Sequence, residues 1–254
     1  MLIKNKIPIL EYDTEPKAVI MPGVKGGPRL PERCAFLFLL DEVDAFAFQH
    51  SCDIIGKFET ITKTYLIYKT VYRDVELCFC QAPLGAPAAV EFLDYLIGCG
   101  VKKIIAAGCC GDLRGWEENI FLIPTHALRD EGTSYHYLPP ARWVVLSEKG
   151  IEAIEKVLKR ECVPCRFCKT WTTDGFYRET PAMVHYRREE GCDAVEIWLP
   201  ALSSEEFSLP SFSLLPIRWR IRKGMTNGAG EKGPFLRLCG FPWKRFANSE
   251  KILK

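Results

Sequence analysis

The chain has 254 residues, of which 48% are hydrophobic, and its formal net charge is +2. This length suits one domain with a substantial core, and so small a net charge gives no case for nucleic acid or a membrane surface as a partner. No apolar run approaches the roughly 20 residues of a membrane helix, and the first residues lack the apolar core of a secretory signal, so we expect a cytoplasmic protein.

The first half of the chain predicts strands, one helix and a glycine turn. Residues 17–23 (KAVIMPG) and 34–40 (CAFLFLL) are expected to be strands, and residues 62–83 a hairpin that turns at Tyr72-Arg73-Asp74. Residues 86–100 have the apolar spacing of an amphipathic helix that ends at a glycine, and 102–111 (KKIIAAGCCG) read as a short strand entering a glycine turn.

The second half continues this alternation. Residues 119–132 predict a strand that runs into a polar loop, and 147–161 a helix with Ser147 as its N-cap. Residues 168–179 predict another strand and loop, and 180–191 a helix with Thr180 as its N-cap and Pro181 at its first position. This order predicts an α/β fold, with a parallel or mixed sheet covered by helices and with ligands bound at the carboxyl ends of the strands.

Twelve cysteines are expected to remain thiols, because a chain of this size without a secretory signal does not suggest a disulfide framework. Cys162, Cys165 and Cys168 are the densest cluster. A metal site there would need Cys192 or His185 as a fourth ligand returning in space, so we expect no metal and favour thiols on a strand and its preceding turn.

Loops at the predicted strand ends hold the candidate binding residues. Glycines in MPGVKGGPR, APLGAPA and AAGCCGD would let backbone N–H groups approach an anion, with Lys25 or Arg29 supplying charge; ordinary tight turns are the alternative. No spacing matches a P-loop or a dinucleotide fingerprint, so no cofactor is expected.

Two further loops concentrate polar and aromatic side chains. RDEGTSYHYLPP contains His136 among more polar groups than a solvated turn requires, although a lone histidine is more often structural. TDGFYRE offers Phe176 as an aromatic face beside Arg178 and Glu179, which would suit a flat heterocycle with polar edges. The alternative is a core phenylalanine followed by a glutamate that caps a helix.

Five segments together carry a resemblance to a known family: AVIMPG, AAGCCGD, DEGTSYHY, TTDGFYRE and EGCDAVEI. They resemble the purine-nucleoside and uridine phosphorylase superfamily, most closely its uridine phosphorylase-like members, over about residues 7–196. The resemblance implies a single three-layer α/β domain around a mixed, partly barrel-like sheet, assembled as dimers or hexamers. It implies phosphorolysis, in which a nucleoside and inorganic phosphate give a free base and ribose 1-phosphate, with uridine as the preferred nucleoside.

The resemblance also implies roles for individual residues. His136 matches a histidine beside the ribose, Phe176 matches the aromatic that packs on the base, and Glu196 matches the first glutamate of a Val-Glu-Met-Glu segment. Gly23, Gly108 and Cys109 match positions that contact phosphate, and Arg178 and Glu179 lie where the base edge would be recognised. Lys25 or Arg29 would have to supply the phosphate charge, and Gly85 of the APLGAPA loop is a further candidate for substrate binding. The arginine that many relatives place two residues before the glycine of the AAGCCG loop is Ala106 here.

The chain departs from this family after Glu196. The glutamate that would hold the ribose hydroxyls is Trp198, and Pro200, Pro210 and Pro216 are incompatible with the single helix expected next. Residues 197–254 also carry an excess of Lys and Arg and no Asp. We therefore divide the chain into an incomplete phosphorylase-like domain (1–196) and an atypical tail (197–254), and we hypothesise that the tail is read in a shifted frame. The coding DNA would have to encode a Met-Glu segment in the alternate frame after Glu196.

The functional expectation is a nucleoside phosphorylase with phosphate as co-substrate. Two alternatives stay open: a purine nucleoside phosphorylase or a nucleosidase that uses water, and a catalytically impaired nucleoside-binding homologue. A metal or redox module built on the cysteines is a third class.

Overall fold

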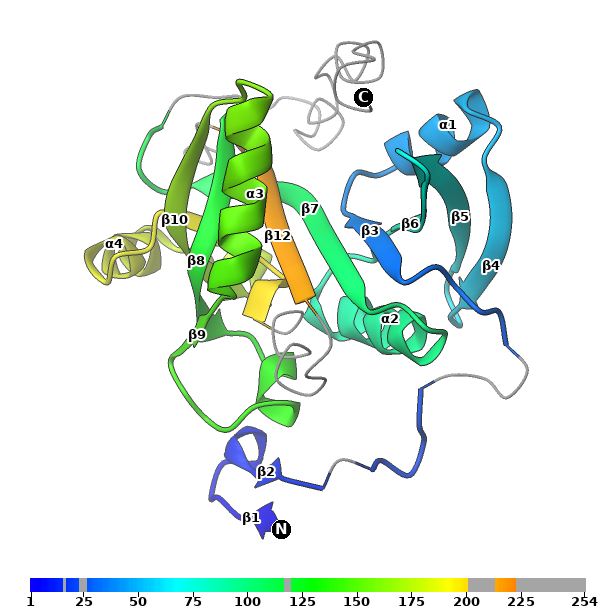
Figure 1. Ribbon diagram of the computed structural model, residues 1–254. Coiled ribbons are helices and arrows are strands. Elements are labelled where there is room, and N and C mark those ends of the chain that lie inside the picture. Colours follow the sequence, from blue (N-terminus) through cyan, green and yellow to red (C-terminus); the bar gives the residue numbers. More distant parts are fainter. Residues whose placement is uncertain (16, 23–26, 117–119, 201–212, 223–254) are drawn as a thin grey trace.

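The computed structural model describes residues 1–15, 17–22, 27–116, 120–200 and 213–222, with the backbone alone for the last of these ranges (Figure 1). The helices are α1 (Glu42–Gln49), α2 (Ala86–Gly98), α3 (Glu148–Arg160) and α4 (Pro181–Glu189). The strands of the large sheet are β3 (Arg33–Leu37), β4 (Asp53–Glu59), β5 (Thr64–Tyr72), β6 (Val75–Gln81), β7 (Lys103–Asp112), β8 (Phe121–Asp130), β9 (Trp143–Val145), β10 (Cys165–Thr173), β11 (Ala194–Glu196) and β12 (Ser213–Arg222).

The large sheet is mixed. Its strand order is β11-β10-β8-β12-β7-β3-β6-β5-β4, with β9 beside β8. The pairs β11–β10, β10–β8, β12–β7, β7–β3 and β3–β6 are parallel, whereas β5 is antiparallel to both β4 and β6. β11 also pairs with the end of β7, so that half of the sheet curls back on itself. Among the described strands β4 pairs only with β5, so the sheet is not a closed barrel.

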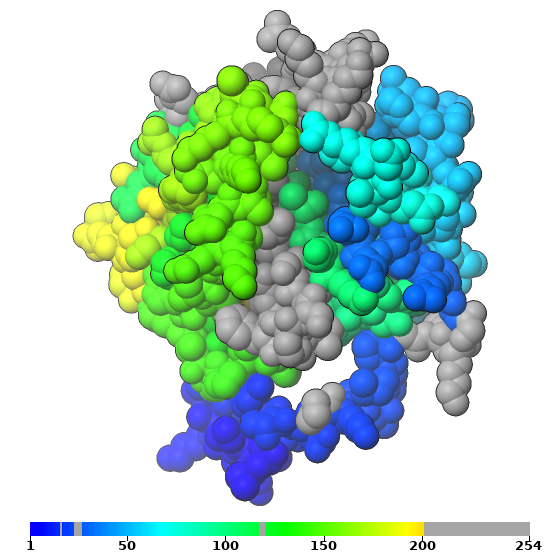
Figure 2. Space-filling model, in the orientation of Figure 1, coloured from blue at the N-terminus to red at the C-terminus, as the bar shows by residue number. Residues whose placement is uncertain are grey.

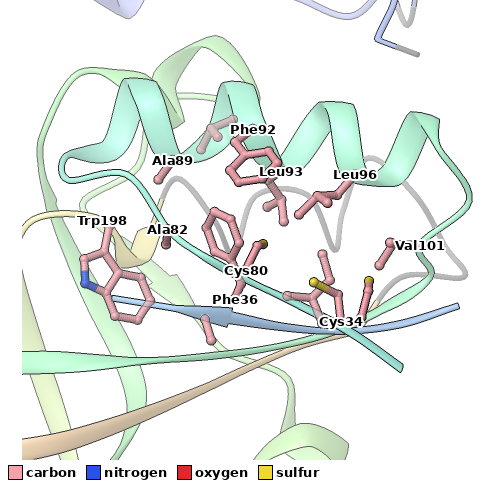
Figure 3. Packing of buried hydrophobic residues seen from close by; sticks show 14 of the residues in the cluster. Cys34, Phe36, Cys80, Ala82, Ala89, Phe92, Leu93, Leu96, Val101 and Trp198 are labelled. Carbon is pink, nitrogen blue, oxygen red and sulfur yellow. The ribbon is translucent and has the colours of Figure 1, made fainter. Parts of the chain in front are cut away.

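Helices cover both faces of the sheet, and the alternation of side chains along β6 shows why. Cys78 and Cys80 point into the core beneath α2, whereas Phe79 between them packs against α1. Figure 3 shows α2 lying over Phe36 and Cys80, with Phe92, Leu93 and Leu96 directed toward them. The other half is built in the same way, because α3 packs on β8 and α4 packs on β10. The predicted three-layer α/β fold is confirmed.

Local sequence signals account for several elements. The β5–β6 hairpin turns at Arg73 and Asp74, both with positive φ (48° and 61°), as a two-residue turn of matching twist requires. Ser147 accepts a hydrogen bond from the Gly150 N–H at the start of α3 (3.4 Å), and Thr180 accepts one from the Met183 N–H at the start of α4 (3.3 Å). The predicted hairpin and both N-caps are confirmed.

The predicted strand over residues 17–23 is wrong for its described part. Residues 17–22 form no strand, and Val19, Ile20 and Met21 are exposed. Their apolar pattern matches a buried strand, but no described strand pairs with them. The chain that follows β2 (Tyr12–Asp13) runs beside an open gap below the body (Figure 2). The first residues do touch the body: β2 pairs with β1 (Leu2–Ile3), and Tyr12 donates to the carbonyl of Tyr137 (3.4 Å).

The glycine turn predicted at the end of 102–111 is also wrong, because β7 continues through both glycines to Asp112. A Cβ on Gly108 would lie 2.9 Å from the Cβ of Phe38, and one on Gly111 would lie 2.7 Å from a Val195 methyl. These glycines therefore admit close neighbours within the strand and do not serve a turn.

Part of the sequence assigned to the atypical tail lies in the sheet. β12 pairs in parallel with β7 and in antiparallel fashion with β8. The expectations for residues 201–212 and 223–254, including the shifted reading frame near the end, lie outside the described residues, as do Gly23 and Lys25. Within the described part of the chain, no helix is both long and apolar enough to cross a membrane.

Candidate functional site

The loops that follow β8, β10 and β11 begin at one edge of the sheet. In the parallel register, Thr173 of β10 lies opposite Asp130 of β8, and Thr172 lies opposite Glu196 of β11. All three strands thus deliver their carboxyl ends to the same edge, which is where ligands bind in open α/β sheets.

The loop after β8, residues 131–142, is called the His136 loop here, and residues 174–180 after β10 are called the Phe176 loop. One hydrogen bond joins them, because the Gly132 N–H donates to Oδ2 of Asp174 (2.9 Å). His136 is the last residue of a 3₁₀ turn, η2 (Thr133–His136), and it is exposed. Phe176 begins a second 3₁₀ turn, η3 (Phe176–Arg178), and is half-buried, with the ring of Tyr177 edge-on at 5.1 Å.

The His136 loop also touches α2. The Tyr137 hydroxyl donates to Oδ2 of Asp94 in α2 (2.8 Å), and the Tyr137 ring packs against the core beneath that helix. Gly85 precedes α2 with φ = +93°, a conformation that favours glycine. The N-terminal amides of α2 carry the partial positive charge that attracts anions.

Glu196 is buried and its carboxylate is fully engaged. One oxygen accepts hydrogen bonds from the hydroxyls of Thr170 (3.3 Å) and Thr172. The other accepts from the backbone N–H groups of Trp198 (2.8 Å) and Leu199 (2.7 Å). The carboxylate therefore caps the chain as it leaves β11, in the way an N-cap side chain holds a helix start.

Trp198 packs between the end of β11, where Glu196 lies, and β7. Its ring is 2% exposed and stacks on Phe38, with ring centroids 4.5 Å apart and an interplanar angle of 14°. Figure 3 shows Trp198 at the end of the core near Ala82 and Ala89. Because Phe38 approaches Gly108 closely, an aromatic pair fills the space between β7 and the end of β11.

The remaining predicted residues are distributed unevenly. Cys109 lies within β7 next to Gly108 and is half-buried. Arg29 is not brought to this edge: its neighbour Leu30 donates to the Cys99 carbonyl (2.9 Å) at the C-terminal end of α2. Gly85 lies at the N-terminal end of that helix. The helix has 13 residues and is therefore about 20 Å long, which separates Gly85 from Arg29 by about that distance. Arg178 is exposed, and Glu179 is half-buried beside it.

Burial raises the pKa of Glu179 to about 7. This carboxyl group can therefore donate a hydrogen bond as well as accept one near neutral pH. That dual capacity suits the edge of a heterocyclic base, which presents both donors and acceptors.

The raised pKa also predicts how stability depends on pH. A carboxyl group whose pKa is higher in the folded than in the unfolded state binds its proton more tightly when folded, so stability falls as pH rises from about 4.5 to about 7. Glu179→Gln should remove this fall, so the variant should gain stability relative to wild type between pH 5 and pH 8. Urea denaturation at both pH values measures the difference, with Glu152→Gln on an exposed face of α3 as control. An equal difference in stability between Glu179→Gln and wild type at both pH values would contradict the raised pKa of Glu179.

The sequence did not single out Asp174, Asp94 or Phe38 as part of this site. Asp174 and Asp94 matter because they join loops and helix, a role that depends on contacts between distant segments. Phe38 follows β3 and looked like an ordinary apolar strand residue. Of these three residues, only Asp94 could have been noticed in the sequence, because it places a carboxylate at a half-buried position of the predicted helix.

Cys165 and Cys168 pack into different clusters, one beneath α3 and one on the other face of the sheet. Among the described residues, no three His, Cys, Asp or Glu side chains are grouped so that they could hold a metal ion.

Comparison with known proteins places this arrangement in a family. Residues 34–197, more than half of the chain, match the family model of the phosphorylase superfamily. The matched range begins after Gly23, Lys25 and Arg29 and ends just after Glu196. A search of curated protein sequences gave no match.

Several solved structures share the fold. Uridine phosphorylase from Vibrio fischeri has a TM-score of 0.67 at 19% identity, covering 76% of this chain and 80% of its own. AMP nucleosidase from Bacteroides thetaiotaomicron has a TM-score of 0.65 at 19% identity, with coverage of 76% and 82%. Purine nucleoside phosphorylase from Toxoplasma gondii has a TM-score of 0.65 at 16% identity, with coverage of 76% and 77%. At these identities the likeness establishes the fold and not the substrate.

Proposed function

Because the chain belongs to the phosphorylase superfamily, we propose that it is a nucleoside phosphorylase that cleaves the N-glycosidic bond of uridine with inorganic phosphate. The products would be uracil and ribose 1-phosphate. Cleavage of this bond passes through a state in which the sugar resembles a cation, so the site must hold an anion near the anomeric carbon and stabilise the departing base.

The sugar and phosphate sides of the site take their residues from the elements around α2 and β7. In this proposal His136 contacts the ribose, and Glu196 holds the strand end beside it. Phosphate would meet the N-terminal amides of α2 after Gly85, the backbone of Gly108, and the backbone and side chain of Cys109. Lys25 and Arg29 remain the proposed source of positive charge, although Arg29 would have to move from its place near the C-terminal end of α2.

The base would lie against the Phe176 loop. Phe176 supplies the aromatic face, and Arg178 and Glu179 supply polar groups for the base edge. With a pKa of about 7, Glu179 can offer a proton to the base as the bond breaks.

One observation carries the proposal: the His136 loop is joined both to the Phe176 loop and to α2. The Gly132–Asp174 and Tyr137–Asp94 hydrogen bonds connect segments expected to hold sugar, base and phosphate. If these segments lay on separate surfaces, they could not bind one nucleoside and an anion together.

The purified chain should release uracil from uridine only when phosphate is present, and ribose 1-phosphate should appear in equal amount. Base release can be followed by absorbance and the sugar product by ³¹P NMR, with and without phosphate. A parallel series with inosine tests whether a purine nucleoside is preferred. Equal base release without phosphate, with free ribose as the product, would refute phosphorolysis.

A nucleosidase that uses water is the second candidate. A Cβ on Gly108 would meet the Phe38 ring and Cβ, and Ala106 takes the place where many relatives have an arginine. The loss of that arginine would leave phosphate with less charge to bind. AMP nucleosidase and a methylthioadenosine/S-adenosylhomocysteine nucleosidase from Campylobacter jejuni share this fold.

An impaired nucleoside-binding homologue is the third candidate. It is favoured by the engaged carboxylate of Glu196 and by Trp198, which is buried where a ribose-binding glutamate is expected. Calorimetry that detects uridine binding without turnover would support this candidate over the other two.

We also propose that the chain works in the cytoplasm as a homo-oligomer. The exposed apolar residues Val19, Ile20 and Met21 support self-association, because contiguous apolar surface of this kind commonly marks a protein contact. Sedimentation velocity would measure the assembly.

A further inference from the structure

A buried polar network lies at the base of the His136 loop. Arg129 and Glu131 are each 5% exposed and Ser134 is 0% exposed. The Ser134 hydroxyl accepts a hydrogen bond from Nε of Arg129 (2.8 Å) and donates one to Glu131, whose other oxygen accepts from the Ser134 N–H (3.0 Å). Ser134 therefore bridges a buried guanidinium and a buried carboxylate.

The same arginine fixes the far side of the loop. Its terminal nitrogens donate to the carbonyls of Pro139 (2.7 Å) and Leu138 (3.3 Å), and its guanidinium lies over the Tyr135 ring at 4.0 Å. The side-chain hydrogen bonds of Arg129 and Glu131 all end within residues 129–139, so their effect is concentrated on the shape of one loop.

Such a network is costly to build. Burial raises the pKa of Glu131 and lowers the pKa of Arg129, which means that the folded environment disfavours the charged form of both groups. Replacing buried ionic groups with apolar residues is often neutral or stabilising, so stability alone is a weak reason for them. Fixing a single geometry is a better-supported reason.

The geometry that is fixed is that of η2, the turn that ends at His136. Glu131 holds the Ser134 N–H inside this turn, while Tyr137 and Gly132 on either side bind Asp94 and Asp174. We propose that Glu131 is a positioning residue, which acts through Ser134 to hold η2 so that His136 faces the ribose. This inference rests on the proposed nucleoside site, because it assigns His136 its sugar contact.

Glu131→Gln keeps the size of the side chain but removes the charge-assisted acceptor. We expect the KM for uridine to rise about tenfold and kcat to fall, while the KM for phosphate stays within about twofold, because phosphate does not contact His136. Ser134→Ala should have a similar effect. The double variant should be no worse than the worse single variant, because the two residues act through each other.

A residue that only stabilises the fold, and does not position His136, would leave the KM values unchanged when it is replaced. Ser147→Ala is the matched control, since it removes a comparable bond from a side-chain oxygen to a backbone N–H at the start of α3. It should lower stability with both KM values unchanged. If Glu131→Gln behaves like Ser147→Ala, positioning is overturned while the proposed function stands.

Hydrogen exchange of the full chain without substrate provides a readout independent of turnover. In Glu131→Gln, amides of residues 132–137 should exchange at least about tenfold faster, with those of β8 and β10 unchanged. If wild type neither binds nor cleaves uridine, the proposed function fails, and exchange alone then decides whether Glu131 holds the turn. Unchanged exchange in 132–137 would overturn the inference in either case.

Discussion

Glu196→Ala is expected to lower the free energy of unfolding by about 3 kcal/mol and to abolish nucleoside cleavage. The substitution leaves the N–H groups of Trp198 and Leu199 buried without their acceptor, and each such loss at a charged partner costs about 1.5–3 kcal/mol. The Thr170 and Thr172 hydroxyls lose an acceptor as well, although Thr170 keeps the Ala194 carbonyl (3.3 Å). Urea denaturation and the uridine assay measure the two effects.

Glu196→Gln separates capping from chemistry. Its amide oxygen can still accept the two backbone N–H groups, and its NH₂ can donate to the threonine hydroxyl oxygens, so we expect a loss of about 1 kcal/mol. If Glu196 also stabilises the developing charge on the sugar, this variant should fold and still lose most of its activity. Thr180→Ala, which removes one cap bond from α4, is the control at about 1 kcal/mol. An alanine variant as stable as wild type would contradict the capping role.

Trp198→Ala should destabilise the protein by about 3–5 kcal/mol, the usual cost of truncating a large buried aromatic side chain. The stack with Phe38 adds about 0.5–1.5 kcal/mol beyond the buried area, and both terms are lost together. Chemical denaturation monitored by far-ultraviolet circular dichroism avoids the change in fluorescence that the lost indole itself would cause.

Tyr177→Ala provides the contrast for this measurement. Tyr177 is 91% exposed, so its truncation should change the free energy of unfolding by no more than about 0.5 kcal/mol. A loss below about 1 kcal/mol for Trp198→Ala would mean that Trp198 does not pack as described, and that the space beside Gly108 is open to a ligand.

Elements with a complete local signal could be predicted from the sequence. The hairpin at Arg73-Asp74 and the helix starts at Ser147 and Thr180 each combine a periodic apolar pattern with a residue suited to the turn or cap. The order of the elements predicted a parallel or mixed sheet covered by helices, and the family resemblance narrowed this to a mixed sheet in a three-layer arrangement.

Elements whose signal depends on distant contacts could not be predicted. α1 was not predicted because only Val43 and Ala47 are buried in it, while Phe48 on the same helix is exposed, so its pattern shows no single apolar face. β4 was not predicted either, and it is an edge strand with many exposed positions. The glycines of β7 looked like turn residues because the close approach of Phe38 and Val195 cannot be read from their own neighbours in sequence.

The candidate site likewise has residues that the sequence predicted and contacts that it could not. His136 and Phe176 stood out because loops rich in polar and aromatic groups are unusual. That Asp174 joins their loops, that Arg29 lies at the other end of α2, and that Glu196 caps its own chain all depend on tertiary contacts.

The thiols beneath α2 give this fold an internal reporter. Cys34 lies opposite Cys78 across the β3–β6 pair, both side chains are buried, and the neighbouring Cys34 thiol together with burial holds the pKa of Cys78 well above its usual range. Thiolates react with alkylating reagents and thiols scarcely do, so modification of this pair requires that β3 and β6 separate. The rate at which this pair is alkylated thus records how often the layer between α1 and α2 opens, without any engineered cysteine.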